Sequence, residues 1–304
     1  MRKTCIIISG PTAVGKTDLA IQLARSYDTE IISADSRQCY IELDIGVAKP
    51  TQEQLDTVPH HFINSHRISE TVNAAVFESY ALSKAHDIFQ KKHVLVMVGG
   101  TGLYIKTFCQ GIDEVPQVIP GMREELTSQY ETNGLAWLQA QAAEEDPLWF
   151  AQGEYKNPHR LLRALEVKRS TGRSILSFQV AKKVERDFDV IHVGLQLPGP
   201  LLHDRINHRV DLMMHAGLLD EVIRLLPQQE LNALNTVGYK ELFSYVAGES
   251  SLEQTVELIK QHTRQYAKRQ ITWFKKMEGI IWAPPELGIV TAIVTRALAE
   301  RSSE

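Results

Sequence analysis

The segment GPTAVGKT at Gly10–Thr17 constrains the fold of this chain more than any other feature of its sequence. Gly10, Gly15, Lys16 and Thr17 fill the pattern GxxxxGK[ST] of a phosphate-binding loop. The preceding residues 4–9 (TCIIIS) form a short apolar, β-branched run, and residues 17–26 carry apolar residues at helical spacing. A strand, a glycine-rich loop and a helix in this order predict the first unit of a parallel α/β sheet.

The residue types of the loop indicate what it binds. Glycines let successive backbone N–H groups wrap an anion, and the positive end of the following helix adds to the attraction. Lys16 supplies a point charge, and the Thr17 hydroxyl can complete the shell of a Mg²⁺ ion, the expected cofactor. By motif alone the loop favours ATP. The predicted phosphate-binding residues are Gly10, Pro11, Thr12, Ala13, Val14, Gly15, Lys16 and Thr17.

Further apolar runs predict the remaining strands, at residues 30–34, 93–98 and 190–197. The runs are continuous rather than alternating, as in strands that are buried on both faces. We therefore predict an α/β fold like that of P-loop NTPases, a parallel sheet covered by helices.

The texture of the sequence changes between residues 111 and 186, where prolines punctuate a loop and only helical patterns follow. We expect an all-helical insertion domain, with helices at 122–133, 134–144, 147–152 and 158–171. The core domain would then comprise residues 1–110 and 187–304. Its C-terminal part is expected to be helical, with residues 201–226 as the longest helix and the last twenty or so residues peripheral.

Composition narrows the class of protein. The 304 residues carry a formal net charge of −4, so any contact with nucleic acid must rest on local basic patches. Three cysteines without a CxxC pair argue against a disulfide framework or a zinc site. No apolar run approaches the roughly 20 residues that a bilayer requires. We expect a soluble, cytoplasmic protein without a membrane partner, and a monomer by default.

Asp35 is the acidic residue nearest the loop in the predicted sheet. A kinase or ATPase would favour a carboxylate at the end of the 93–98 strand, but Gly99-Gly100-Thr101 follow there. Asp35 ends the second strand instead, at the sheet edge where ligands bind. It can hold metal, act as a base or cap a helix, and the sequence leaves these three roles open.

Several segments together resemble the bacterial tRNA dimethylallyltransferase (tRNA isopentenyltransferase) family. They are GPTAVGKT, SADSRQCY, IGVAKP, HHFI, VGGTGLYIK, LLRALEV and RQYAKRQITWF, spread from about residue 4 to residue 276. The resemblance implies transfer of a dimethylallyl group from dimethylallyl diphosphate to N6 of adenosine 37 in tRNA. Mg²⁺ assists, pyrophosphate leaves, and the anticodon stem-loop is the implied partner.

The resemblance also assigns residues position by position. It places the diphosphate on Gly10–Thr17 and makes Asp35 the base toward the adenine amine. The implied tRNA contacts are Asp35, Ser36, Arg37, Gln38, Thr101, Arg123, His159, Arg160, Leu161, Leu162 and Arg163. Three departures affect these regions. Val47 replaces the usual threonine of IGTAKP, VPQVIPGMR lacks the aspartate often found before its arginine, and Pro158 begins the arginine-bearing helix.

The chemistry requires these residue types. A carboxylate bonded to the weakly nucleophilic adenine amine can orient it and accept its proton, and cations must stabilise the departing pyrophosphate. Arg205 and Arg209 lie four apart on one helix face, so they either reach the diphosphate or face solvent. The expected catalytic residues are Asp35, Lys16, Thr17, Thr101, Arg205 and Arg209. Two basic stretches, at residues 156–173 and 260–276, are expected to grip RNA.

Three rival functions share parts of this pattern. A small-molecule kinase shares the loop and the sheet, and an adenylate isopentenyltransferase shares the chemistry but acts on a free nucleotide. An RNA-binding, GTPase-like switch would need the guanine-reading NKxD motif, which the chain lacks. The adjacent His60 and His61 are interpreted as structural, because neighbouring side chains rarely share one metal ion.

Overall fold

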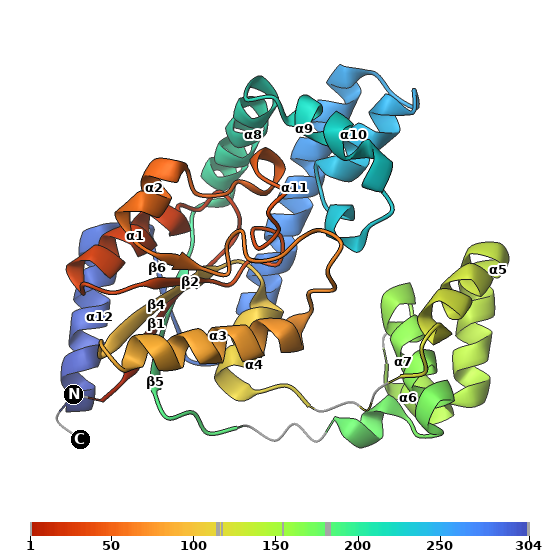
Figure 1. The fold of residues 1–304 in the computed structure, drawn as a ribbon, viewed down its shortest axis with the longest axis horizontal. Helices are drawn as coiled ribbons and strands as arrows, with labels where there is room; N and C mark the ends of the chain where they lie inside the picture. Colours follow the sequence, from red (N-terminus) through yellow and green to blue (C-terminus); the bar gives the residue numbers. More distant parts are fainter. Residues whose placement is uncertain (1, 114–115, 117, 154, 180–183, 303–304) are drawn as a thin grey trace. The chain divides into compact units, whose positions relative to one another are not determined.

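The computed structural model describes residues 2–113, 116, 118–153, 155–179 and 184–302 (Figure 1). The chain divides into two compact units. One comprises Met1–Gln110 and Glu185–Glu304, and the other is Gly111–Val184. We call them the sheet unit and the helical unit. In the described residues no helix is long and apolar enough to cross a membrane.

The sheet unit contains one parallel sheet with the strand order β3-β2-β4-β1-β5-β6. Every strand pairing within it is parallel, which confirms the predicted sheet. The strands are β1 (Thr4–Ser9), β2 (Ile31–Ser33), β3 (His60–His61), β4 (Val94–Gly99), β5 (Asp189–Leu195) and β6 (Ile280–Ala283). Their carboxyl ends therefore meet at one edge, where ligands of such sheets bind.

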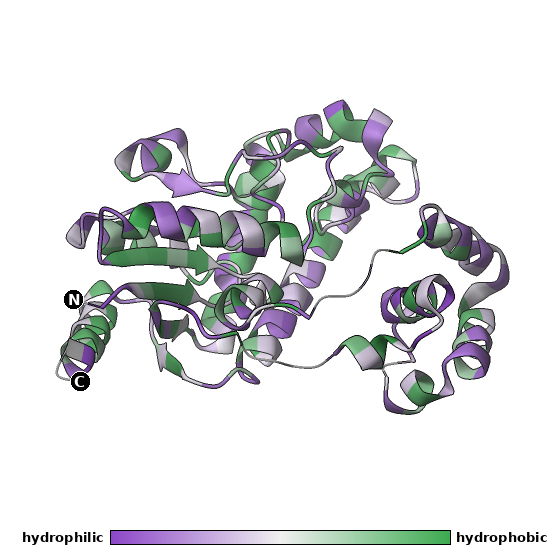
Figure 2. Ribbon diagram, turned by 60° about the horizontal axis from the view of Figure 1, so that its bottom comes forward, coloured by the Kyte–Doolittle hydropathy of each residue, from purple (hydrophilic) through white to green (hydrophobic). Residues whose placement is uncertain are grey.

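Alternate residues of the strands supply the two faces of the core. Cys5 and Ile7 of β1 belong to the cluster that α3 (Ala74–Phe89), α4 (Gly102–Gln110) and part of α11 (Leu252–Phe274) complete. Ile6 and Ile8 belong to the opposite cluster. That face is covered by α1 (Lys16–Ser26), α8 (Gly199–His215) and α12 (Leu287–Ser302). Figure 2 shows the central strands as continuously hydrophobic, as their burial on both faces requires.

Two expectations for the C-terminal part were wrong. The predicted long helix at 201–226 is two helices, α8 and α9 (Leu218–Leu225), because Gly217 adopts a left-handed conformation with φ of 96°. The last residues are not peripheral. β6 joins the sheet, and Val290 and Val294 of α12 are fully buried against it. The remaining elements are α2 (Gln52–Thr57), α10 (Tyr239–Val246), and the 3₁₀ helices η1 (Ile45–Val47), η3 (Leu226–Gln228) and η4 (Asn232–Leu234).

The helical unit has a core of its own, built on Leu126, Leu138, Trp149 and Leu165. Its elements are α5 (Met122–Glu145, interrupted at Gly134), α6 (Pro147–Gln152), α7 (Pro158–Thr171) and η2 (Ile175–Phe178). Pro158 occupies the first turn of α7, where its missing N–H is no loss, and the Asn157 side chain caps the helix. The proline that departs from the family pattern is thus compatible with the helix.

Candidate active site

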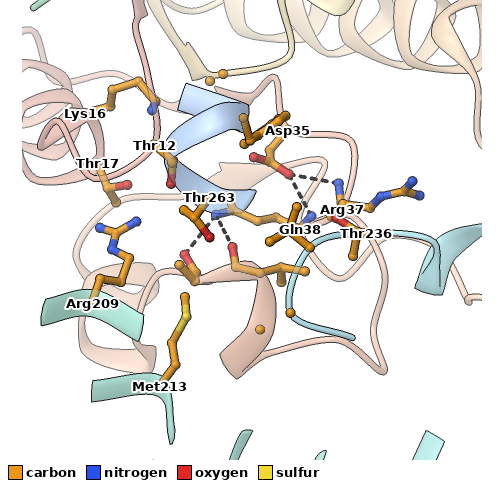
Figure 3. Close-up of a pocket in the computed structure, with 18 of the residues that line it drawn as sticks. Thr12, Lys16, Thr17, Asp35, Arg37, Gln38, Arg209, Met213, Thr236 and Thr263 are labelled. Atoms are coloured by element: carbon orange, nitrogen blue, oxygen red, sulfur yellow. Dashed lines mark hydrogen bonds between the residues drawn. The ribbon is translucent and has the colours of Figure 1, made fainter. Parts of the chain in front are cut away.

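A pocket lies at the carboxyl ends of β1, β2 and β4 (Figure 3). α8 and α11 supply its other walls. Its polar lining includes Thr12, Lys16, Thr17, Asp35, Arg37, Gln38, Arg209, Thr236, Thr263 and Gln270. Its apolar lining includes Val47, Pro50, Ile63, Val98, Val210, Met213, Leu218, Val237 and Ile259. The pocket thus combines a phosphate-binding loop with a hydrocarbon-compatible wall.

Backbone geometry explains the loop at Gly10–Thr17. Gly10 has φ of 147°, and a Cβ there would lie 2.7 Å from the Leu195 carbonyl oxygen, so the position requires glycine. Gly15 is left-handed, with φ of 102°. α1 begins at Lys16, so the positive end of this helix follows the loop directly.

Lys16 is a half-buried cation that lines the pocket. Its Nζ donates a hydrogen bond to the Pro11 carbonyl at 2.7 Å. Burial lowers the pKa of the Lys16 ammonium from its ordinary value to about 7, and the nearby Arg209 lowers it further than Asp35 raises it. An anion in the pocket would oppose both effects and favour the charged lysine.

The two arginines of α8 both lie at the loop. Arg205 Nη1 donates to the Val14 carbonyl at 3.3 Å, and Arg209 lines the pocket. Burial lowers the pKa of Arg209 from its ordinary value. Arg209 is therefore not part of a solvated face. Lys16 and Arg209 thus line the pocket, while Arg205 is exposed and contacts the loop from outside it.

Asp35 both shapes a turn and lines the pocket. Its Oδ1 accepts the N–H groups of Arg37 at 2.8 Å and Gln38 at 3.2 Å (Figure 3). The following residues form a turn rather than a helix. Thr101 supports the same turn, since its Oγ1 accepts the Ser36 N–H at 3.1 Å. The Thr101 side chain, an expected catalytic group, is thus bonded to the backbone of this turn.

Gln270 is a residue of the pocket that sequence reasoning missed. Its Oε1 accepts the Thr12 N–H at 2.8 Å, and its Nε2 donates to the Gly100 carbonyl at 3.0 Å. One side chain of α11 therefore ties the phosphate loop to the turn after β4. The contact spans 258 positions in the chain, so no local pattern signals it.

A second missed group holds the segment that carries Val47. The buried Glu221 carboxylate accepts the N–H groups of Ile45 and Gly46, at 2.8 and 3.1 Å, and the Tyr239 hydroxyl at 2.5 Å. Gln38 Nε2 donates to the Val47 carbonyl from the other side, at 3.2 Å. The segment therefore forms a fixed wall of the pocket.

The protein groups available to a magnesium ion are few. The described residues contain no group of three or more His, Cys, Asp or Glu side chains able to hold a metal. Thr17 and Asp35 nevertheless line one pocket with the phosphate loop. Mg²⁺ keeps several waters and is commonly held by one or two protein groups together with substrate phosphates. The residues present fit an ion that arrives with a diphosphate.

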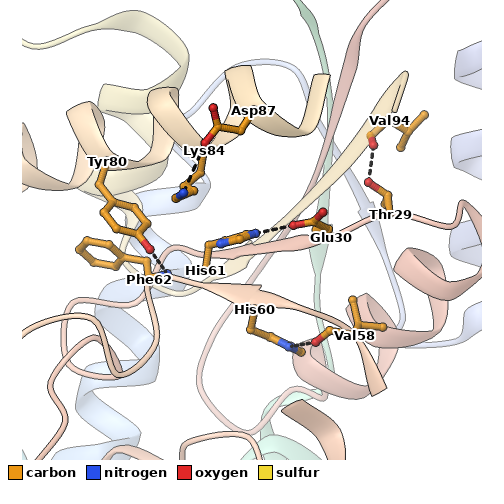
Figure 4. Close-up of polar contacts among 10 residues, drawn as sticks. All are labelled: Thr29, Glu30, Val58, His60, His61, Phe62, Tyr80, Lys84, Asp87 and Val94. Carbon is orange, nitrogen blue, oxygen red and sulfur yellow. Dashed lines mark hydrogen bonds and ion pairs between the residues drawn. The ribbon is translucent and has the colours of Figure 1, made fainter. Parts of the chain in front are cut away.

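His60 and His61 point to opposite sides of β3 (Figure 4). His61 Nε2 contacts Glu30 Oε2 at 2.6 Å, and His60 Nδ1 contacts the Val58 carbonyl at 2.7 Å. Burial lowers the pKa of His60 from its ordinary value. In these contacts each ring has a partner of its own.

A second hollow adjoins the pocket and shares Arg37, Thr236, Val237 and Tyr266 with it. Its remaining lining is largely polar, with Ser36, Asn235, Lys240, Glu241, Ser244, Ser250, Leu258, His262, Gln265 and Arg269. Arg37 Nη2 donates to the Asn235 carbonyl at 3.3 Å, and the Arg269 guanidinium lies 5.8 Å from the Tyr266 ring centre. Lys260, expected in the basic stretch, is paired with Asp211 and Glu257.

In the helical unit, the structure separates the residues expected to touch RNA. Leu161 and Leu162, which belong to the implied tRNA-contact segment, have side chains buried in the core of the unit. A helix must turn part of every such segment inward, and its two leucines fill that role. His159 and Arg160 are exposed, and Arg163 is partly exposed.

Comparisons with known proteins match this architecture. The IPP transferase family model matches residues 38–277. A tRNA dimethylallyltransferase from Christiangramia forsetii is 48% identical, over 93% of each chain. A tRNA dimethylallyltransferase 1 from Bacteroides fragilis is 44% identical, over 93% of this chain and 94% of its own.

Solved structures match over similar lengths. The tRNA isopentenylpyrophosphate transferase from Bacillus halodurans has a TM-score of 0.74 and 32% identity, and the match covers 99% of both chains. A eukaryotic dimethylallyltransferase acting on tRNA has a TM-score of 0.76 and 27% identity, covering 92% of this chain and 74% of its own.

Proposed function

Because this chain belongs to the IPP transferase family of tRNA dimethylallyltransferases, we propose that its pocket transfers a dimethylallyl group from dimethylallyl diphosphate to N6 of adenosine 37 in tRNA. Pyrophosphate is the leaving group, and Mg²⁺ is the cofactor. The observation that carries the proposal is the convergence of the phosphate loop, Lys16, Arg209 and Asp35 on a pocket with an apolar wall.

The donor would lie with its diphosphate on Gly10–Thr17 and its hydrocarbon against the apolar wall. Lys16, Arg205 and Arg209 are the cations at the loop. Negative charge grows on the bridging oxygen as the C–O bond breaks, and preorganised cations stabilise that charge. Mg²⁺, held by Thr17 and the diphosphate, adds a positive charge when bound.

The acceptor amine would approach Asp35. Its Oδ1 is engaged by two backbone N–H groups, so the carboxylate has a fixed orientation in the pocket. The second oxygen, Oδ2, is the one that would accept the proton of the amine as the new C–N bond forms. Proton transfer to a positioned base contributes about 10²–10⁴ in rate.

The target base must leave its stack to reach this pocket. The adjoining hollow supports an entry route for RNA, since it brings Arg37, Lys240 and Arg269 together with the Tyr266 ring. Cationic side chains for phosphates and an aromatic face for a base are the usual means of binding looped RNA.

Structure weakens the kinase alternative. The position that would carry a metal-binding carboxylate at the end of β4 is Gly99, where a Cβ would lie 2.1 Å from the Ala34 carbonyl oxygen. No side chain fits there. The adenylate isopentenyltransferase alternative leaves the second hollow and the helical unit without a substrate to contact.

Radiolabelled dimethylallyl diphosphate tests the proposal when it is incubated with the protein, Mg²⁺ and either tRNA or AMP. We expect label in the tRNA fraction, at the adenosine 3′ to the anticodon, and none in AMP. Label in AMP alone would establish the free-nucleotide enzyme. Phosphoryl transfer from labelled ATP, with no prenyl transfer, would establish a kinase.

A further inference from the structure

Two arginines of the helical unit share one buried carboxylate. Arg163 Nη1 donates to Glu166 Oε2 at 2.8 Å, and Arg123 Nη2 lies 3.3 Å from the same oxygen. The Glu166 side chain is 6% exposed, whereas each arginine side chain is 38% exposed. Arg123 comes from the first turn of α5 and Arg163 from α7, so the carboxylate brings together two helices.

The arrangement leaves an excess of positive charge. A buried carboxylate must be paired, and one arginine would neutralise it. Here two arginines contact the carboxylate, so the three groups together carry a net charge of +1. A guanidinium carries five N–H donors, and each arginine directs one nitrogen to Glu166 in the contacts described. Their partly exposed ends can donate to a second anion.

A neighbouring ion pair between the same two helices is different. Arg169 of α7 donates through Nε and Nη2 to both oxygens of Glu145, and through Nη2 to Gln141. That pair is one arginine to one carboxylate, so its charge is balanced. The unbalanced charge between α5 and α7 therefore lies at Glu166 rather than at Glu145.

We propose that Glu166 is a positioning residue that holds Arg123 and Arg163 as one receptor for an RNA backbone phosphate. The inference rests on the proposed function, because it requires an RNA substrate. A phosphate is the fitting anion, since two guanidinium groups held side by side donate in parallel to its oxygens. Because Glu166 already orders the two long side chains, less conformational entropy is lost when RNA binds.

The substitution Glu166→Gln separates positioning from simple electrostatics by the sign of its effect. Removing a negative charge from an RNA-binding surface should tighten tRNA binding if only net charge matters. A positioning role predicts the opposite. We expect the KM for tRNA to rise about tenfold, with kcat and the KM for dimethylallyl diphosphate unchanged.

Glu145→Gln is the matched control, because it makes the same charge change on a balanced pair of the same unit. We expect it to leave tRNA binding unchanged or slightly tighter. The salt dependence gives a second readout. The tRNA association constant falls as salt rises, and each lost phosphate contact makes the slope of log K against log salt less steep by about 0.7–0.9. Glu166→Gln should lower that slope by about this amount.

Single and double arginine variants test the receptor even if Glu166→Gln impairs folding. In Arg123→Met, the charge of the remaining Arg163 is neutralised by Glu166. This single variant should therefore lose most of the tRNA affinity that the double variant Arg123→Met/Arg163→Met loses. Adding Glu166→Gln to that double variant should cost no further tRNA affinity. Additive losses from the two arginines would overturn the proposal.

The behaviour of the wild-type protein separates the phosphate receptor from the proposed function. If the wild-type protein transfers the dimethylallyl group to tRNA but Glu166→Gln binds tRNA as well as wild type or better, the phosphate receptor is wrong and the proposed function stands. If the wild-type protein neither binds nor modifies tRNA, the proposed function itself fails.

Discussion

At the scale of one residue, the two oxygens of the Asp35 carboxylate differ in the hydrogen bonds described, because both backbone N–H groups bind Oδ1. Oδ1 holds the turn through the N–H groups of Arg37 and Gln38, while the carboxylate faces the pocket. The sequence left a metal ligand, a base and a helix cap as alternatives, and the structure replaces the helix cap with a turn while leaving the carboxylate in the pocket. A carboxylate that holds a turn is also well oriented, because its hydrogen bonds restrict rotation of the side chain.

Asp35→Asn should therefore be more informative than Asp35→Ala. The amide oxygen can keep accepting the two N–H groups, so the turn is retained, but the charge and the proton acceptor are lost. We expect kcat for prenyl transfer to fall by about 10²–10⁴, with the dissociation constant for tRNA within about a factor of three. Near-wild-type single-turnover rates would remove Asp35 as the base.

Lys16 predicts a pH dependence of donor binding. Its pKa of about 7 in the unliganded pocket lies below the ordinary value of 10.5, because burial disfavours the charged form. A bound diphosphate favours the ammonium, so binding above pH 7 requires proton uptake. The KM for dimethylallyl diphosphate should be nearly flat below pH 7 and rise by up to about tenfold per pH unit above it.

Steady-state kinetics from pH 6 to 9 measure this profile. Lys16→Arg is the control, since a guanidinium remains charged throughout that range and its KM profile should stay flat above pH 7. A wild-type profile that matches the Lys16→Arg profile would show that Lys16 does not titrate in the free enzyme.

At the scale of secondary-structure elements, α11 is fastened to the phosphate loop through Gln270. Gln270→Met keeps the size of the side chain but leaves the Thr12 N–H and the Gly100 carbonyl without this partner. A buried polar group left unpaired costs about 1–3 kcal/mol. We expect the free energy of unfolding to fall by about 2 kcal/mol and the KM for the donor to rise.

Gln261→Met on the same helix is the matched control, because residue 261 is exposed. Urea titration should place its stability within about 0.5 kcal/mol of wild type. Equal effects of the two substitutions would indicate that the change reflects helix α11 itself rather than the tie to the loop.

The segment around Gly46 offers a second test between elements. A Cβ on Gly46 would lie 2.5 Å from the buried Tyr239 ring, which is fixed by its bond to Glu221. Gly46→Ala should therefore destabilise the protein by about 1–3 kcal/mol through overpacking and weaken donor binding.

In α12, Gly288 has open space around its Cβ position, so Gly288→Ala should stabilise the protein by about 0.5–1 kcal/mol. Thermal melts of both variants provide the comparison, and melting shifts of the same sign would contradict this account.

At the scale of the whole molecule, the core predicts loss of stability in acid. His192 on β5 is buried, with Nε2 2.8 Å from Ser9 Oγ, and burial lowers its pKa to about 4. The unfolded chain binds the proton near pH 6.5 and the folded protein only near pH 4. This contribution to stability is fully present above pH 6.5 and falls as the pH drops toward 4, by about 3 kcal/mol.

Urea titrations at several pH values between 4.5 and 7 check this contribution. His192→Asn keeps a hydrogen-bonding side chain at the position but does not titrate. Its free energy of unfolding should fall less steeply with acid than that of wild type, with the difference growing below pH 6.5. Parallel curves for the two proteins would assign the acid sensitivity to other groups.

Local patterns in the sequence determined the framework of this protein. The GxxxxGK[ST] loop between an apolar strand and a helix, the continuous apolar strands, and the helices of residues 122–171 are all present as predicted. The IPP transferase family followed from motifs in a fixed order. Such features depend on neighbours in the chain, because backbone propensity and the strand or helix period act over a few residues.

Only the tertiary structure decided which distant side chains serve the pocket and the proposed receptor. Gln270 reaches Thr12, Glu221 reaches Gly46, and Glu166 binds Arg123 across two helices. The pairing of β6 depends on distant residues in the same way, because an edge strand gains its hydrogen bonds from a partner far along the chain. The phosphate loop is specified by eight consecutive residues. The groups that fix its surroundings come from segments as far apart as 258 positions, and folding alone brings them together.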